Sequence, residues 1–283
     1  MSEAGRVLIT GCSSGFGLHS AMLFAGRGWR VWAGVRDPDR AHALRAVATE
    51  ASAGSIEILT LDVAKHEQVT SAVAEMERVA GGVDVLVNNA GYGYFGFVEQ
   101  ADLDEVRANF ETNVFGLLAV TQTVLPIMRR QGRGRIINLS SLVGRFAFPL
   151  SGPYCATKHA VEALSEALYH EVRGFGIHVS VIQPGMFLTD FQSRSLRVHP
   201  DTDNPASPYA AVREGTRRRR AKQAEAAGDP REVAEVIWKA ATAPTPRFRY
   251  RVGADAEEYL SMRERMTDEE FFAEMETRHA NPQ

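Results

Sequence analysis

The chain has 283 residues, of which 45% are hydrophobic and 24% charged, and its formal net charge is −3. These values are typical of a soluble globular protein, and the length suits one large α/β domain. The near balance of acids and bases argues against nucleic-acid binding by the chain as a whole. No apolar stretch reaches the roughly 18 residues that a membrane helix needs, so we expect no integral membrane segment.

The N-terminal stretch and the number of cysteines bear on export and on metal binding. The N-terminal stretch carries Glu3 and only a short apolar run before Gly11, which argues against a signal peptide. Cys12 and Cys155 are the two cysteines, too few for a disulfide framework or a metal cluster. We therefore expect a cytoplasmic protein without a metal site.

Short apolar runs alternate with helical stretches along most of the chain. In chain order we predict strand 6–10, helix 20–26, strand 30–35, helix 39–53, strand 56–62, helix 67–80, strand 83–88, helix 103–130, strand 135–140, helix 154–173, strand 178–183, helix 230–241 and strand 248–252. The strands are continuous apolar runs, which is typical of a parallel sheet covered on both faces. The order predicts a Rossmann-like, doubly wound parallel α/β sheet of about seven strands.

The regular alternation stops between residues 190 and 228, where prolines, aromatic residues and a basic run occur. We interpret this segment as an insertion that forms a substrate-binding lid on a single domain spanning 1–283. Residues 253–283 are expected to form a C-terminal helical extension. Pro126 lies near the end of the long helix 103–130, where a kink is expected.

A glycine-rich turn follows the first predicted strand. Its glycines permit a tight turn and bring backbone N–H groups close to a pyrophosphate at a helix N-terminus. Such a turn also occurs purely for packing, but its place between strand and helix favours dinucleotide binding. The candidate cofactor-binding residues here are Gly11, Ser13, Ser14, Gly15, Phe16 and Gly17.

The end of the second strand bears on the choice of cofactor. An acid at this point would bind a ribose 2′-hydroxyl and select NAD, but Val35 occupies the position and Arg36 follows. An arginine can bind a 2′-phosphate, which favours NADP(H). Asp37 leaves NAD(H) open, because it could pair with Arg36 or contact the ribose itself.

Tyr154 and Lys158 are four residues apart in a predicted helix and so share one face. A free tyrosine has a pKa near 10, too high for proton exchange at neutral pH. A lysine ammonium and a nicotinamide cation nearby would lower that pKa and let Tyr154 exchange a proton with a substrate oxygen. A serine hydroxyl at the end of the fifth strand, Ser140 or Ser141, could hold the same oxygen.

Several motifs occur together in one order, and on them the chain resembles the short-chain dehydrogenase/reductase family over nearly its full length. The motifs are Thr10 to Gly17, Leu61-Asp62-Val63, Asn88-Asn89-Ala90-Gly91, Asn113, Ser141, Tyr154-Cys155-Ala156-Thr157-Lys158, and Pro184-Gly185 with Thr189. A finer similarity, to the branch with 17β-hydroxysteroid dehydrogenase type 1 and the retinol dehydrogenases, includes Val35-Arg36-Asp37 and residues 229–234. That branch favours NADP(H), and in it the serine matching Ser13 helps to bind the 2′-phosphate.

The resemblance implies a role for each motif. Asn113, Ser141, Tyr154 and Lys158 would be catalytic, with Ser141 preferred to Ser140 because it stands thirteen positions before the tyrosine. Asn113 would hold a water that links Lys158 to solvent, and Lys158 would bind the nicotinamide ribose. The remaining cofactor contacts would come from Asp62, Val63, Asn89, Ala90, Gly91, Pro184, Gly185 and Thr189.

Apolar side chains are frequent where the substrate should bind, which favours a sizeable apolar substrate such as a steroid, retinoid, lipid or polyketide. They are Tyr94, Phe95, Phe97, Leu142, Val143, Phe146, Phe148, Phe187, Phe191 and Leu196, each of which could instead belong to the core or to a dimer interface. The basic run Arg217–Arg220 is read as a solvated helix face, or else as a contact for an anionic substrate group, a carrier protein or a membrane surface.

Together these observations predict an NADP(H)-dependent ketoreductase or alcohol dehydrogenase that forms a homo-oligomer, dimer or tetramer, as the family does. Two alternatives remain: a non-catalytic NADP(H)-binding redox sensor, and an epimerase or dehydratase related to the family. The intact set of Asn113, Ser141, Tyr154 and Lys158 weighs against a sensor. A shorter C-terminal part and a different glycine spacing weigh against an epimerase.

Overall fold

The computed structural model describes residues 5–50, 53–189 and 195–280. A seven-stranded sheet with strand order β3-β2-β1-β4-β6-β7-β9 forms its centre, and every pair of neighbouring strands is parallel. The predicted Rossmann-like sheet is therefore confirmed. The strands are β1 (Arg6–Thr10), β2 (Arg30–Val35), β3 (Ser55–Thr60), β4 (Val85–Asn88), β6 (Gly134–Leu139), β7 (Ile177–Pro184) and β9 (Arg249–Val252).

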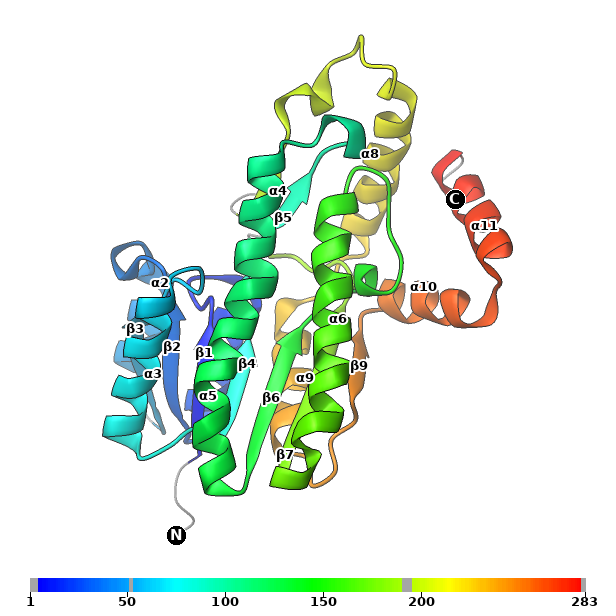
Figure 1. The fold of residues 1–283 in the computed structure, drawn as a ribbon. Coiled ribbons are helices and arrows are strands. Elements are labelled where there is room, and N and C mark those ends of the chain that lie inside the picture. The colour runs from blue at the N-terminus through cyan, green and yellow to red at the C-terminus, as the bar shows by residue number, and fades with distance from the viewer. Residues whose placement is uncertain (1–4, 51–52, 190–194, 281–283) are drawn as a thin grey trace.

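Helices cover both faces of this sheet. Along β1, Val7 and Ile9 belong to one core and Leu8 to another, because successive side chains in a strand point to opposite faces. The first core includes residues of α1 (Gly15–Gly26), α2 (His42–Glu50) and α9 (Pro230–Thr242). The second includes residues of α3 (His66–Ala80), α5 (Leu117–Gln131) and α6 (Gly152–Val172), the helices in front of the sheet in Figure 1.

The segment predicted to be a lid has secondary structure of its own. Strand β8 (Leu196–Val198) pairs in parallel with the short strand β5 (Gly93–Phe95), and a 3₁₀ turn over Pro200–Asp203 leads to α8 (Ala210–Glu225). Residues 190–194, including the predicted pocket residue Phe191, lie outside the described residues. Figure 1 shows α8 and β5 above the carboxyl ends of the sheet strands.

Two C-terminal helices, α10 (Ala254–Arg265) and α11 (Asp268–Ala280), extend to one side of the sheet in Figure 1. They share a third apolar core with the segment that follows β6. Phe146 contacts the rings of Phe148, Tyr259 and Phe271 in edge-to-face or tilted geometry, and Leu142 and Val143 lie in the same core. The extension therefore supports the loop that carries Ser141. Among the described helices, none is long and apolar enough to cross a membrane.

The helix predicted over 103–130 is interrupted. Helix α4 (Leu103–Phe110) passes into a π-helical segment, Glu111–Gly116, before α5 begins. Pro126, where a kink was expected, lies within α5. The helix departs from α-helical geometry before this residue, at the π-helical segment. Single π turns are rare and concentrate at functional sites. This one contains Asn113.

Three other predicted boundaries were wrong. Helix α1 begins at Gly15, not at residue 20, so the second half of the glycine-rich turn is already helical. Strand β3 ends at Thr60, which leaves Leu61 and Asp62 in the loop after it. The helix predicted over 39–53 is a 3₁₀ turn, Pro38–Arg40, followed by α2, because Pro38 supplies a helix start that precedes the apolar pattern.

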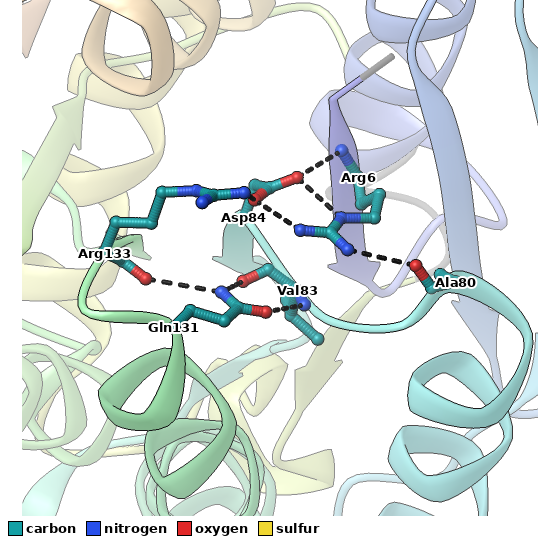
Figure 2. Close-up of polar contacts among 6 residues, drawn as sticks. All are labelled: Arg6, Ala80, Val83, Asp84, Gln131 and Arg133. Carbon is teal, nitrogen blue, oxygen red and sulfur yellow. Dashed lines mark hydrogen bonds and ion pairs between the residues drawn. The ribbon is translucent and has the colours of Figure 1, made fainter. Parts of the chain in front are cut away.

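A polar network closes the amino-terminal end of the sheet (Figure 2). The buried Arg6 donates from Nε and Nη2 to the two carboxylate oxygens of Asp84, at 2.8 and 2.9 Å, and from Nη1 to the carbonyl of Ala80. Gln131 bonds both the N–H and the carbonyl of Val83. Burial works to raise the pKa of Asp84, but the hydrogen bonds and charge of Arg6 outweigh it and hold that pKa below its usual value.

Candidate active site

The glycine-rich turn lies where β1, α1 and the loop after β4 meet. Gly11 has φ of +72°, and a Cβ there would come within 2.8 Å of the Ala90 Cα. A Cβ on Gly17 would come within 2.4 Å of the Gly11 carbonyl oxygen. Asn89 fixes the approach by donating from Nδ2 to the carbonyls of Thr10 and Gly11. These glycines are required because the backbones approach too closely for any side chain.

The N-terminus of α1 opens into a cleft. Ser14 is its N-cap residue, yet its side chain makes no capping hydrogen bond within the described part of the chain, and no acid occupies the first turn. The first backbone N–H groups of α1 are therefore available to an anion. The same cleft is lined by Gly11, Ser13, Ser14, Gly15, Phe16, Arg36, Val63, Asn89, Ala90, Gly91, Tyr154, Lys158 and Thr189 from the predicted set.

Arg36 and Asp37 are in different environments. Arg36 is exposed, lines the cleft and has no ion-pair partner in the described ranges. Asp37 caps the 3₁₀ turn Pro38–Arg40, because its Oδ1 accepts the N–H of Asp39 at 3.0 Å. The aspartate is thus occupied by the backbone, and the cation is the group left for a ligand.

Some predicted cofactor residues lie elsewhere. The carboxylate of Asp62 accepts the N–H of Ala64, and it is Leu61 and Val63 that line the cleft. Pro184 and Gly185 line the neighbouring pocket, and Gly17 is a packing position. The cleft also contains Tyr92, Thr112, Ser195 and Arg197, which the sequence analysis missed. No motif could have identified them, since their positions depend on the π turn and on β8.

Tyr154, Ser141 and Lys158 converge beside this cleft. Tyr154 and Lys158 are on the first turns of α6, and Ser141 follows β6 and caps the short 3₁₀ turn after it. Ser141 and Tyr154 line the same neighbouring pocket, where the Ser141 hydroxyl donates to the Pro184 carbonyl at 3.4 Å. The Lys158 ammonium lies 5.8 Å from the centre of the Tyr154 ring and donates to the Leu139 carbonyl at 2.7 Å. The structure therefore brings the three predicted side chains together.

Burial shifts the pKa values of both Tyr154 and Lys158 in the chain alone. Burial raises the pKa of Tyr154 above its usual value, and only the Ser141 hydrogen bond opposes that rise. Burial lowers the pKa of Lys158 to about 8, while the charge of Glu162 works to raise it. The predicted lowering of the Tyr154 pKa involves the nicotinamide cation as well as Lys158, and it stays a prediction for the cofactor-bound site.

Asn113 is held by the loop after β4. Its Nδ2 donates to the carbonyl of Tyr92 at 2.9 Å and to Thr157 Oγ1 at 3.1 Å, and its Oδ1 accepts the N–H of Tyr92. A Cβ on Gly91 would lie 3.0 Å from Asn113 Oδ1 and 3.8 Å from Lys158 Nζ. Gly91 therefore lies between the Asn113 side chain and the Lys158 ammonium. The proton relay through Asn113 stays a prediction.

A second pocket adjoins the first, and Phe16, Ser140, Tyr154 and Thr189 line both. Of the apolar residues predicted to face the substrate, Phe95, Leu142, Val143, Phe148 and Phe187 line this pocket. Phe146 lies in the C-terminal core, and Tyr94 is fully buried. The pocket also contains residues that the motifs do not indicate: Ser151, Met186, Arg219, Arg220, Gln223 and Asp255.

Cys155 offers no alternative chemistry. It is buried against Ser151, and burial raises the pKa of its thiol, so it would not act as a thiolate nucleophile.

A cleft at a helix N-terminus, joined at a tyrosine to an apolar pocket, is the arrangement expected of an α/β oxidoreductase that binds a dinucleotide. The family model for short chain dehydrogenase matches residues 5–198, and the chain belongs to this family. The predicted family and enzyme class are confirmed.

Individual relatives support this assignment. Human 17-beta-hydroxysteroid dehydrogenase type 1 is 38% identical over 252 residues, which cover 86% of this chain and 76% of the human protein. A short-chain dehydrogenase from Streptomyces avermitilis has a TM-score of 0.83 at 32% identity, covering 98% of this chain and 97% of the other. An alcohol dehydrogenase from Thermococcus sibiricus, complexed with 5-hydroxy-NADP, has a TM-score of 0.72 at 25% identity, covering 89% of this chain and 97% of the other.

Proposed function

We propose that this protein is an NADP(H)-dependent oxidoreductase that interconverts a ketone or aldehyde and the corresponding alcohol on a largely apolar substrate. The observation that carries the proposal is the position of Tyr154. Its side chain lines both the polar cleft and the apolar pocket, and Ser141 lines that pocket with it. A proton donor at this junction can reach an oxygen of a substrate in the pocket while the cleft holds the cofactor.

The residues present fit NADP(H). The open N-terminus of α1, with Ser13 and Ser14, would hold the pyrophosphate and Arg36 the 2′-phosphate, while Lys158 would hold the nicotinamide ribose. The neighbour from Thermococcus sibiricus was crystallised with an NADP derivative, which supports the same choice. When bound, the reduced nicotinamide supplies a hydride.

In the reducing direction, Tyr154 would donate its phenolic proton to the carbonyl oxygen, and Ser141 would hold that oxygen by a hydrogen bond. In the chain alone, burial holds the pKa of Tyr154 above its usual value, so the phenol carries the proton that reduction consumes. The positive charges of Lys158 and of the bound cofactor would lower that pKa toward the range in which the proton can be exchanged. A water held beside Asn113 would link Lys158 to solvent, and Lys158 would pass a proton from this water to the tyrosine. In the oxidising direction the same groups would work in reverse.

We further propose that residues 190–228 form the substrate lid and that 253–283 support it. Helix α8 contributes Arg219, Arg220 and Gln223 to the pocket, and α10 contributes Asp255. Family members pair long helices between subunits, and Leu103 and Phe115, on α4 and its π turn, are 64% and 53% exposed. We propose a homo-oligomer formed through this face.

The test is oxidation of NADPH and NADH, followed by absorbance, with a panel of steroid, retinoid, aromatic and aliphatic carbonyls. We expect turnover with NADPH, and a loss of about 10³-fold or more in Tyr154→Phe with NADPH binding retained. Undiminished turnover in Tyr154→Phe would remove the proposed proton donor. Tight NADPH binding without turnover of any carbonyl would favour a redox sensor.

A further inference from the structure

The basic run on α8 is divided by the helix into an outer and an inner pair. Arg217 and Arg218 are exposed, and Arg217 pairs with Glu214. Arg219 is only 6% exposed, although it follows directly in sequence. Gly215 and Arg219 are four residues apart, so they share the buried face of α8. The prediction of a solvated face therefore holds for only half of the run.

Arg219 is buried and has no counter-ion among the residues that the structure describes. Its guanidinium carbon lies 3.6 Å from the centre of the Phe148 ring, and Nη1 donates to Gln223 Oε1 at 2.7 Å. Its Nε is buried and has no hydrogen-bond partner, and no carboxylate pairs with it within the described ranges. Burial lowers the pKa of Arg219 to about 10. A buried charge of this kind is costly unless something pairs with it.

Arg220 lines the same pocket from the next position on α8. Its guanidinium carbon lies 4.3 Å from the centre of the Phe95 ring, and it too has no carboxylate partner in the described part of the chain. Among the described residues that line this pocket, Asp255 is the one acid, and its oxygens accept the N–H groups of Met186 and Ala256 at 2.8 and 2.9 Å. The pocket thus presents two cations whose charge its own acid does not meet.

We infer that the substrate carries an anionic group, a carboxylate or similar oxyanion, which binds Arg219 and Arg220 while its carbonyl or alcohol contacts Tyr154. This inference rests on the proposed function and specifies its substrate class. Two guanidinium groups stacked on phenyl rings offer donors in a fixed orientation, the arrangement that oxyanions prefer. The apolar part of the substrate packs against Leu142, Val143 and Phe187 in the same pocket.

Matched acids and esters test this inference by calorimetry on the NADP⁺-loaded protein, where a ketone binds but cannot be reduced. The probes are 4-acetylbenzoate and oxo-fatty acids of varied length, each beside its methyl ester. We expect at least one acid to bind about tenfold or more tightly than its ester, equivalent to about 1.4 kcal/mol. If no acid exceeds its ester, the inference is overturned.

Variants locate the preference. In Arg219→Met/Arg220→Met we expect acid and ester to bind alike, because the preference for the acid is lost with the two guanidinium groups. Arg217→Met/Arg218→Met, on the exposed face of the same helix, should keep the full preference. Arg219→Lys/Arg220→Lys retains the charges and should keep part of it, which provides a folded comparison if the methionine variant is unstable. A preference that survives the inner variant, or falls equally in the outer one, contradicts the inference.

The two proposals fail separately. Turnover of uncharged ketones with NADPH, abolished in Tyr154→Phe, together with equal binding of acids and esters would reject the anionic substrate and leave the oxidoreductase. An arginine-dependent preference for acids without turnover of any probe would support the anion site and count against the chemistry.

Discussion

Arg6 and Arg219 are buried guanidinium groups at opposite ends of the same sheet. Arg6, at the amino-terminal end of β1, forms a two-point ion pair with Asp84 and also bonds the Ala80 carbonyl (Figure 2). Arg219, in the pocket beyond the carboxyl ends of β6 and β7, has one amide partner and leaves its Nε without any in the described residues. The charge of Arg6 is therefore paired within the fold, whereas we infer that the charge of Arg219 pairs with a ligand.

Other cations at the two ends of the sheet differ in the same way as Arg6 and Arg219. At the carboxyl end, Lys158 donates to one backbone carbonyl, and Arg36 has no ion-pair partner in the described ranges. In open α/β sheets ligands bind in the crevice outside the carboxyl ends of the strands. We therefore expect substitutions at the amino end to reduce stability, and substitutions at the carboxyl end to reduce binding or turnover.

The largest stability effect is expected from Arg6→Met. Removing the guanidinium leaves the partly buried Asp84 without its main counter-ion, and the free energy of unfolding should fall by about 3–5 kcal/mol. Denaturant unfolding measures it, and turnover per folded molecule should be unchanged. Arg133→Met, which removes a longer and more exposed contact to the same acid, should cost less than about 1 kcal/mol. Equal losses in the two variants would break the comparison.

The Arg6–Asp84 pair also predicts a dependence on acid. The pKa of Asp84 is lowered in the folded state, so the pair stabilises the protein above the unfolded pKa of about 3.9 and ceases to do so as the pH falls through the folded value. Wild type should lose stability between about pH 5 and 2 more steeply than Asp84→Asn. Parallel curves would show that the pair contributes little.

Arg36→Ala is expected to weaken NADPH binding by about 10- to 100-fold and to change NADH binding by less than about threefold. The side chain is exposed and has no ion-pair partner in the described ranges, so stability should not change. Fluorescence titration of both cofactors measures the ratio. Arg129→Ala, which removes an exposed arginine from α5, is the charge control. An equal loss for both cofactors would reverse the choice of NADP(H).

Lys158→Met should raise stability while it removes activity. Burial in the folded state lowers the pKa of Lys158 from 10.5 to about 8, so the buried charge reduces the free energy of unfolding at neutral pH. The variant also loses the hydrogen bond to the Leu139 carbonyl. After this loss is subtracted, the free energy of unfolding should rise by about 1–2 kcal/mol at pH 7.

The sign of this effect depends on pH. Between about pH 8 and 10.5 the unfolded chain keeps a lysine proton that the folded chain has lost, so wild-type stability rises with pH there. The advantage of Lys158→Met should therefore disappear above about pH 10.5. Thermal unfolding without cofactor, at pH 7 and near pH 10.5, measures it. A destabilised variant at pH 7 would show that Lys158 is structural, like Arg6.

Much of the fold and of the candidate site could be predicted from local patterns in the sequence. A parallel sheet buried on both faces requires continuous apolar strands, and these are visible in residues 6–10, 30–35 and 135–140 without any knowledge of the fold. The close backbone approaches at Gly11 and Gly17 permit only glycine. The cofactor turn can therefore be recognised from its glycines in the sequence. Tyr154 and Lys158 are four residues apart on one helix, and helical geometry alone makes them neighbours.

Other features depended on contacts between distant segments. The π turn at Asn113 forms where α4, α5 and the Tyr92 loop meet, and the high pKa of Tyr154 reflects burial that no spacing reports. Arg217 and Arg219 are the same residue type, two positions apart in one basic run. Only the packing of α8 beside Phe148 turns one toward solvent and the other into the pocket, because burial is a property of the assembled fold.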